Sequence, residues 1–105
     1  MEATKHLETA LKGNSKNANI QALVGRAYLY ADKPMPEMAL SYLEKARDLD
    51  PKQSKYWIYL GDAYQLKGDL GQAMTSFETA VEKNKKDPET YVKMARIWAD
   101  GKNLD

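Results

Sequence analysis

The stretch WIYLGDAY, residues 57–64, is apolar, aromatic and helix-like, yet it has a glycine in its middle. Inside a helix, Gly61 costs about 1 kcal/mol relative to alanine, because glycine loses more backbone freedom when the helix forms. A glycine between Leu60 and Asp62 therefore indicates a position where a larger side chain does not fit. The rest of the sequence shows that this position recurs.

The glycine belongs to an internal repeat. Gly25, Gly61 and Ala95 are 36 and then 34 residues apart, and an aromatic residue follows each of them by three positions. The apolar and aromatic neighbours are Val24 and Tyr28, Leu60 and Tyr64, and Met94 and Trp98. Because residues three and four apart lie on one face of a helix, each set predicts a helix with an apolar face.

A second apolar pattern alternates with the first. It has an alanine, a larger apolar residue four positions later, and an alanine three positions after that. The three occurrences are Ala3, Leu7 and Ala10; Ala39, Leu43 and Ala46; and Ala73, Phe77 and Ala80. Two helix patterns in alternation predict a chain of helix pairs.

Turn and cap signals divide the chain into six helices. Ser54 is a candidate N-cap, and Asp87 precedes Pro88, which suits the first position of a helix. The helices are expected at about residues 2–12, 18–31, 36–48, 54–67, 70–84 and 88–100.

The segment DKPMPE, residues 32–37, contains two prolines. Proline cannot continue a helix interior, and the residue before it avoids helical angles. We therefore expect an enlarged turn here, with Met35 exposed between the prolines, and Met38 on a packing face of the following helix.

Six residues of the central unit carry a resemblance to a known family. They are Trp57, Leu60, Gly61, Tyr64, Ala73 and Phe77, and at this spacing they resemble the tetratricopeptide repeat signature. The resemblance implies an all-α fold, a helical-repeat solenoid of antiparallel helix pairs, as a single domain over residues 1–105. Gln21 stands where the first full repeat should have tryptophan, and Lys85 stands where the second should have its closing proline.

The same resemblance divides the chain into units. Residues 1–13 match the second helix of a partial repeat, 18–53 and 54–87 match full repeats, and 88–105 match the first helix of a truncated repeat. In such a unit the two helices cross closely, so residues at the crossing must be small. The small residues expected there are Gly25, Gly61 and Ala95 on the first helices and Ala39 and Ala73 on the second, with Tyr64 and Phe77 filling the space beside them.

Composition excludes several functional classes. Lys plus Arg number 16 and Asp plus Glu 15, so a net charge of +1 gives no bulk attraction to nucleic acid or to an anionic membrane. The absence of cysteine excludes disulfides and thiolate metal sites. No stretch approaches the roughly 18 apolar residues of a membrane span, and the N-terminus has no apolar signal core. These patterns do not choose between cytoplasm and periplasm.

No arrangement of catalytic residues is present. The only histidine, His6, has no HExxH-like partner and is interpreted as a solvent-facing residue of the first helix. No nucleophile elbow or phosphate-binding loop occurs. We expect no catalytic residue, no metal site and no cofactor, and a protein that is not an enzyme.

The resemblance implies a concave surface, lined by the first helix of each unit, that holds an extended peptide or a helix of a partner protein. The partner-binding residues that it assigns are Asn19, Arg26, Lys55, Tyr59, Asp62, Gln65, Glu89, Lys93 and Arg96. Further inner positions are Ala22, Leu29, Tyr30, Ile58, Leu66, Val92 and Asp100.

Two features of this surface restrict the kind of partner that it can be expected to bind. Some family members grip a peptide carboxylate with a Lys and Asn clamp, but Ala22, Tyr59 and Glu89 occupy matching positions here, so the clamp is not present. Arg26, Asp62 and Arg96 share one position in successive units, where they either pair with each other or grip an acidic partner group.

The sequence therefore predicts a non-catalytic protein-interaction scaffold. The alternative is an architectural or self-assembly segment of a larger helical-repeat protein. RNA recognition at one base per repeat would need a strongly basic inner face, and this one is mixed, so we expect neither a nucleic acid nor a membrane as partner.

The last helix is expected to expose an apolar face. Residues 88–100 have no second helix to cover Met94, Ala95 and Trp98, and GKNLD, residues 101–105, should form a turn. We expect a homodimer, or contacts between copies, through the 91–98 face. We attribute this association to truncation, because the missing second helix would occupy the same surface.

Overall fold

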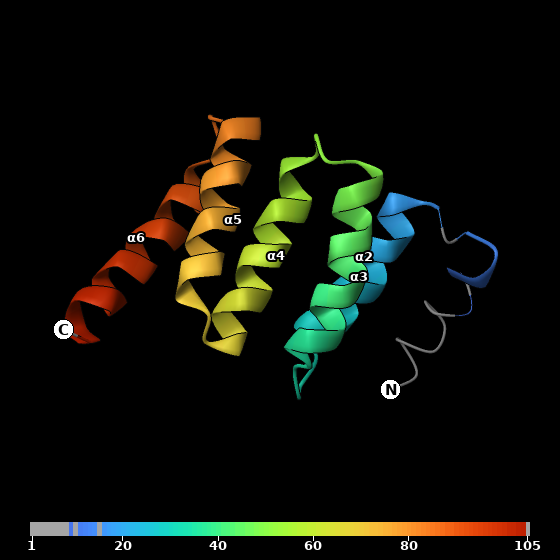
Figure 1. The fold of residues 1–105 in the computed structure, drawn as a ribbon, viewed down its shortest axis with the longest axis horizontal. Helices are drawn as coiled ribbons and strands as arrows, with labels where there is room; N and C mark the ends of the chain where they lie inside the picture. The colour runs from blue at the N-terminus through green and yellow to red at the C-terminus, as the bar shows by residue number, and fades with distance from the viewer. Residues whose placement is uncertain (1–8, 10, 15, 105) are drawn as a thin grey trace.

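The protein is a row of antiparallel helices (Figure 1). The structure is a computed structural model and describes residues 9, 11–14 and 16–104. Its helices are α2 (Ala18–Leu29), α3 (Pro36–Leu49), α4 (Ser54–Lys67), α5 (Leu70–Lys83) and α6 (Pro88–Leu104). The predicted all-α class is confirmed, since the described part of the chain contains helices and turns but no strand.

The helices form consecutive pairs. α2 packs along α3 and α4 along α5, while contacts of α3 with α4 and of α5 with α6 join one pair to the next. The row measures 45 × 29 × 18 Å, with α2 and α6 toward its opposite ends (Figure 1). The predicted solenoid of helix pairs is confirmed.

Helix bounds agree with the prediction to within two residues, except at the two ends of the chain. Of the predicted helix 2–12, Thr9, Leu11 and Lys12 are helical, and the other residues lie outside the described part. The predicted turn after residue 100 is wrong, because α6 continues to Leu104. Gly101 alone costs only about 1 kcal/mol inside a helix, and none of residues 102–104 is a proline that would break it.

One of the two predicted N-caps is confirmed. Asp87 Oδ1 accepts a hydrogen bond from the Glu89 backbone N–H at 3.0 Å at the start of α6. The prediction for Ser54 is wrong, because Ser54 is the first residue of α4. Gln53 holds the cap position without a side-chain hydrogen bond, so the chain enters this helix one residue too early for the serine to cap it.

Two apolar clusters form the core. The first joins α2, α3 and α4, and its largest members are Leu29, Leu43, Tyr56 and Leu60. The second joins α5 to α6 through Ala73, Phe77 and Ile97. Tyr64 packs against both clusters. Each large side chain buried in this way stabilises the fold by about 1.5–3 kcal/mol.

The glycines lie at the helix crossings, as predicted. A Cβ added at Gly61 would lie 2.6 Å from Phe77 Cζ, and one added at Gly25 would lie 2.6 Å from Leu43 Cγ. The expectation that Ala39 and Ala73 face the glycines needs correction. The large Leu43 and Phe77 side chains lie nearest to them, and the Ala39 carbonyl oxygen lies 3.2 Å from the Cβ position of Gly25.

The turn between α2 and α3 is ordered and enlarged, as predicted. It occupies residues 30–35, whereas only Gly68 and Asp69 separate α4 from α5. The Met35 backbone N–H donates to the Tyr28 carbonyl at 3.0 Å, which closes the long turn. The Met35 side chain is 49% exposed, which confirms that prediction.

We predict that Gly61→Ala destabilises the protein by about 1–3 kcal/mol, because the buried Phe77 ring cannot move away from the added methyl group. Thermal unfolding measures the effect, at about 4–8 °C per kcal/mol for a chain of this size. Gly71→Ala is the control, since its Cβ would have only Asp69 Oδ1 nearby at 3.8 Å. The control should be neutral or stabilising by up to about 1 kcal/mol. Equal effects of the two substitutions would contradict the crossing argument.

We also predict uneven hydrogen exchange in the turns. The amides of Gly68 and Asp69 donate to helix carbonyls at 3.1 and 2.9 Å, and the amide of Met35 is bonded as well. These three should be protected, whereas the amides of Asp32 and Lys33 should exchange faster because the long turn opens locally. Equal protection at all five positions would show that the proline-containing turn is not a separate opening unit.

Candidate protein-interaction surface

The first helices α2, α4 and α6 carry the residues assigned to partner binding. Asn19, Arg26, Lys55, Glu89 and Arg96 are exposed, and Tyr59, Asp62, Gln65 and Lys93 are partly exposed. Of the further inner positions, Ala22 and Leu29 are buried, and the Asp100 side chain lies outside the described residues. The assigned positions are therefore accessible, while part of the expected apolar lining belongs to the core.

A hollow of about 210 Å³ lies between α2 and α4. Its cationic groups rest on aromatic rings: the Arg26 guanidinium lies 4.9 Å from the centre of the Tyr59 ring, and Lys55 Nζ lies 5.5 Å from that of Tyr56. The Tyr56 hydroxyl donates to Asn19 Oδ1 at 2.6 Å, which fixes the ring. The rings orient both cations without neutralising them.

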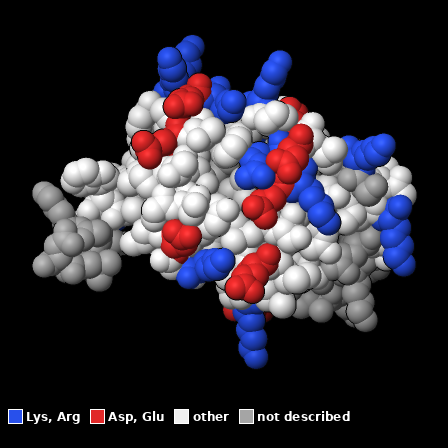
Figure 2. Space-filling model, in the orientation of Figure 1, with Lys and Arg blue, Asp and Glu red and all other residues white. Residues whose placement is uncertain are grey.

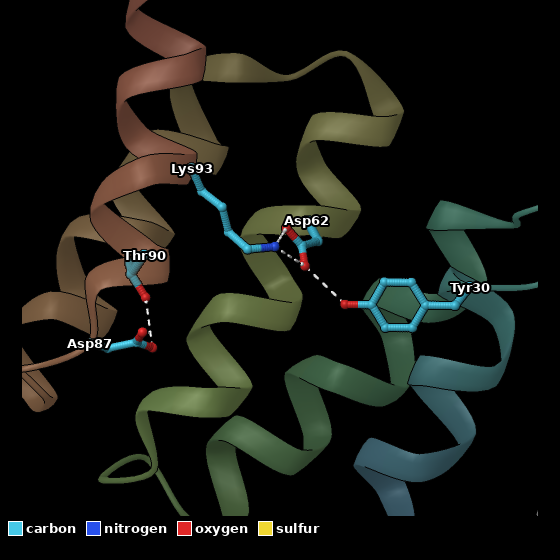
Figure 3. Close-up of polar contacts among 5 residues, drawn as sticks. All are labelled: Tyr30, Asp62, Asp87, Thr90 and Lys93. Atoms are coloured by element: carbon cyan, nitrogen blue, oxygen red, sulfur yellow. Dashed lines mark hydrogen bonds and ion pairs between the residues drawn. The ribbon is translucent and has the colours of Figure 1, made fainter.

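The carboxylate of Asp62 connects α4 to α6 and to the residue that follows α2 (Figure 3). Asp62 on α4 accepts hydrogen bonds from Lys93 Nζ on α6, at 2.8 Å to Oδ1 and 2.9 Å to Oδ2. The hydroxyl of Tyr30, just after α2, donates to Asp62 Oδ2 at 2.9 Å. The Asp62 side chain is only 13% exposed, so this ion pair is better shielded from solvent than an ordinary surface pair.

This network differs from the mutual pairing that the sequence offered as one possibility for Arg26, Asp62 and Arg96. Asp62 pairs with Lys93 and not with Arg26 or Arg96, which occupy the equivalent positions in the neighbouring units. Burial raises the pKa of the Tyr30 phenol above its usual range, and the Asp62 carboxylate raises it further. Tyr30 therefore remains a hydrogen-bond donor to Asp62 throughout the neutral pH range.

Two more hollows follow toward the enlarged turn. One, of about 510 Å³, is lined by Tyr30, Pro34, Asp62, Leu66 and neighbouring residues. The next, of about 580 Å³, is lined by Met35, Met38, Leu66 and neighbours, so Leu66 belongs to both. The expectation that Met38 lies on a packing face is wrong, because its side chain is exposed. Met38 is the third residue of α3 and lines this hollow instead.

The α6 end of the surface carries charges of both signs. Glu89, Val92, Lys93 and Arg96 line a hollow of about 340 Å³. Figure 2 shows Lys and Arg side chains interspersed with Asp and Glu on the face in view, with uncharged surface between them. The face in view therefore has no continuous basic area of the kind that binds a nucleic acid backbone.

Two kinds of site are absent among the described residues. They contain no group of three or more His, Asp or Glu side chains placed to hold a metal ion. Among them, no helix is long and apolar enough to cross a membrane. His6, interpreted from the sequence as solvent-facing, lies outside the described part of the chain.

We predict measurable coupling between Asp62 and Lys93. In a double-mutant cycle with Asp62→Ala and Lys93→Ala, the interaction energy should be about 0.5–2 kcal/mol. The Asp62 carboxylate is shielded from solvent, and both of its oxygens accept hydrogen bonds from Lys93 Nζ. The control cycle uses Arg47 and Asp48, whose ion pair at 3.0 Å has a 70% exposed carboxylate side chain. The control should give about 0–0.5 kcal/mol, and an Asp62–Lys93 value no larger than that would contradict the network.

Comparison with known protein sequences agrees with this geometry. The family profile described as tetratricopeptide repeat matches residues 35–97. The TPR repeat-containing protein PA0015 of Pseudomonas aeruginosa is 36% identical over 72 residues, which are 69% of this chain and 67% of that protein. The general transcriptional corepressor ssn6 of Schizosaccharomyces pombe is 29% identical over 92 residues, 86% of this chain but only 8% of that protein.

Solved structures agree on the fold. The crystal structure of MamA superposes with a TM-score of 0.86 at 19% identity, covering 96% of this chain and 57% of that one. The Yersinia enterocolitica type III secretion translocator chaperone SycD superposes with a TM-score of 0.76 at 15% identity, covering 93% and 66%. These likenesses concern the fold alone. Since the sequence profile covers more than half of the residues and the helix pairs follow its register, the chain belongs to the tetratricopeptide repeat family.

Proposed function

We propose that this chain is a non-catalytic protein-interaction scaffold that binds an extended peptide segment of a partner along α2, α4 and α6. Membership of a repeat family that binds protein partners supports the general function. The observation that carries the finer proposal is the succession of hollows along these helices, cationic between α2 and α4 and apolar beside the enlarged turn.

The cationic hollow suits an acidic group of the partner. Arg26 and Lys55 lie against tyrosine rings, and neither forms an ion pair with another described residue. A carboxylate entering between them would gain charge-assisted hydrogen bonds from donors that are already oriented. Asn19 and Tyr59 complete the wall of this hollow and provide polar and aromatic contacts.

The hollow beside the turn suits an apolar side chain. Lys93 neutralises Asp62, so the wall formed with Leu29, Pro34 and Leu66 carries no free charge. Leu66 is 53% exposed and would lose contact with water when a partner side chain covered it. Gln65 lies in the same wall, where it can bond to the peptide backbone.

The remaining assigned residues lie where a longer peptide would continue. Glu89 and Arg96 line the hollow on α6 together with Lys93, so this end offers one charge of each sign beyond the neutralised pair. We therefore propose that the preferred peptide has an acidic residue toward the α2 side and an apolar residue beside the turn.

We predict the result of selecting short random peptides on the immobilised protein. Selected peptides should be enriched in sequences with a Glu or Asp a few residues from a Leu or Phe. The double variant Arg26→Glu with Lys55→Glu should lower the affinity for a selected peptide by at least about ten-fold, because two attractive charges become repulsive. Fluorescence anisotropy measures this affinity. Lys86→Glu, in the exposed loop before α6, is the matched control and should change the affinity little. Unchanged binding in the double variant would place the contact elsewhere.

A second candidate function is self-assembly, favoured by the uncovered face of α6. Its large apolar residues Tyr91, Val92 and Trp98 are exposed, and Trp98 is exposed at 66%. Self-association through α6, predicted from the sequence as a homodimer, would cover this face.

A further inference from the structure

The hollow between α2 and α4 carries charge of one sign only. Its described lining contains the cations Arg26 and Lys55 and neither Asp nor Glu. The neighbouring hollows each have an acidic residue in their walls, which is Asp62 or Glu37 toward the enlarged turn and Glu89 on α6. A ligand that neutralises the hollow between α2 and α4 therefore needs two negative charges, whereas each neighbouring wall already has a negative charge of its own.

Tyrosine rings hold both cations in place without removing their charge. The Arg26 guanidinium lies over the ring of Tyr59, and Lys55 Nζ lies over that of Tyr56. Neither cation forms an ion pair with another described residue. The guanidinium therefore keeps N–H donors for a ligand, and its fork can give two parallel hydrogen bonds to the oxygens of one anion.

Neutral groups of the wall add to this donor set. Because Asn19 Oδ1 accepts the hydrogen bond of the Tyr56 hydroxyl at 2.6 Å, the Asn19 amide nitrogen is left as a donor. Burial raises the pKa of the Tyr56 phenol, and the Asp50 carboxylate and Tyr59 raise it further, so the phenol stays protonated at neutral pH. The Asp50 side chain does not line the hollow.

The start of α4 lies at the same place. Lys55 and Tyr56 belong to the first turn of this helix, and Gln53 at the cap position makes no side-chain hydrogen bond to it. The positive end of the helix dipole therefore adds to the potential of the two cations. The dipole would not make a binding site by itself, but it favours a ligand of the same sign as the cations do.

A phosphoryl group fits this hollow better than a carboxylate does. A phosphorylated side chain carries about −1.5 to −2 charges at pH 7 and three strong acceptor oxygens. The carboxylate of Glu or Asp carries a single charge on two oxygens, so one cation of the hollow would stay unneutralised. The volume of about 210 Å³ corresponds to about seven water molecules of the liquid, which is room enough for the few heavy atoms of a phosphate.

We propose that the hollow between α2 and α4 binds a phosphorylated side chain of the partner peptide, so that phosphorylation of the partner controls its binding. The inference rests on the peptide groove proposed above and specifies the charged group that the groove prefers. A nucleic acid backbone or an anionic membrane presents many phosphates in a row. The acidic residues of the neighbouring hollows would repel all but one of them, whereas a peptide brings a single phosphate with apolar residues beside it.

Matched peptides test the preference for phosphate. One pool of fluorescent peptides has phosphoserine at a fixed central position, a Leu or Phe on one side and varied residues elsewhere, and a second pool has glutamate at the centre. Both pools are selected on the immobilised chain. Each selected peptide is then made with phosphoserine, with glutamate and with serine at the centre, and fluorescence anisotropy measures the three affinities.

Phosphoserine should bind at least about ten-fold more tightly than glutamate, because the second cation gains a charged partner. Arg26→Gln and Lys55→Gln should each remove most of this ratio, since either variant leaves one cation in the hollow. Lys86→Gln is the matched control, because it removes an exposed cation in the loop before α6, and it should leave all three affinities unchanged. Circular dichroism checks that each variant is folded.

Phosphorus NMR shows whether the phosphate itself is held by the two cations. The second pKa of a free phosphoserine is about 6. This pKa should fall when the peptide is bound to the native chain, because both cations favour the dianion, and it should fall less with Lys55→Gln. An unchanged pKa in the complex would place the phosphate outside the hollow and overturn the proposal.

The remaining outcomes separate this inference from the proposed groove. Equal affinities for phosphoserine and glutamate, both weakened by Arg26→Gln, would overturn the phosphate preference and leave the acidic groove standing. Affinities that neither variant changes would overturn both. Vesicles containing phosphatidic acid present the same phosphomonoester on a lipid, and inorganic phosphate presents the group alone. If either one bound through Arg26 and Lys55 as tightly as the selected phosphopeptides, a peptide would not be the specific ligand and the proposal would be wrong.

Discussion

The structure depends on two close approaches between a helix backbone and a large side chain of its partner helix. Phe77 lies against Gly61 and Leu43 against Gly25, at distances where even a methyl group would collide. These contacts bring α4 to α5 and α2 to α3 at a spacing that lets the apolar clusters close around Leu60 and Leu43. Glycine is unfavourable for the isolated helix, so tertiary packing must exceed that local cost of about 1 kcal/mol. The repeat thus depends on the absence of a Cβ atom at Gly25 and Gly61.

Much of this fold could be predicted because the signals are local and recur. Gly25, Gly61 and their aromatic neighbours fix a helix face, and Pro34 and Pro36 fix a turn, whatever the rest of the chain does. The partner of Asp62 could not be predicted in this way. Arg96 occupies the equivalent position in the next unit, yet Lys93, one turn earlier on α6, places its ammonium group within 2.8 Å of the carboxylate. That choice depends on side-chain reach and helix rotation, which no spacing encodes. The exposure of Met38 was missed because periodicity describes a helix face and not the neighbours that cover it.

The three first helices present two different surfaces. Their inner side is polar and aromatic, with cations on rings near α2 and a neutralised carboxylate at the centre. Their other side is apolar and buried by the following helix in the first two units, but it is exposed on α6 around Trp98. Side chains three or four positions apart on the same helix therefore belong to surfaces with different chemistry. The cationic hollow of the proposed peptide site and the exposed apolar face of α6 therefore share no residues.

The network around Asp62 has a mechanical consequence. In a helical-repeat array each unit normally contacts only its neighbours, so the end unit frays independently and the curvature of the row is soft. Here a hydroxyl from residue 30 and an ammonium group from residue 93 meet on one carboxylate between them. A change in the rotation of α6 relative to α4 would stretch the Lys93 bond, and a change at the other junction would stretch the Tyr30 bond. We therefore expect Asp62 to resist rotation at both junctions at once, in addition to the apolar contacts that hold neighbouring helices together.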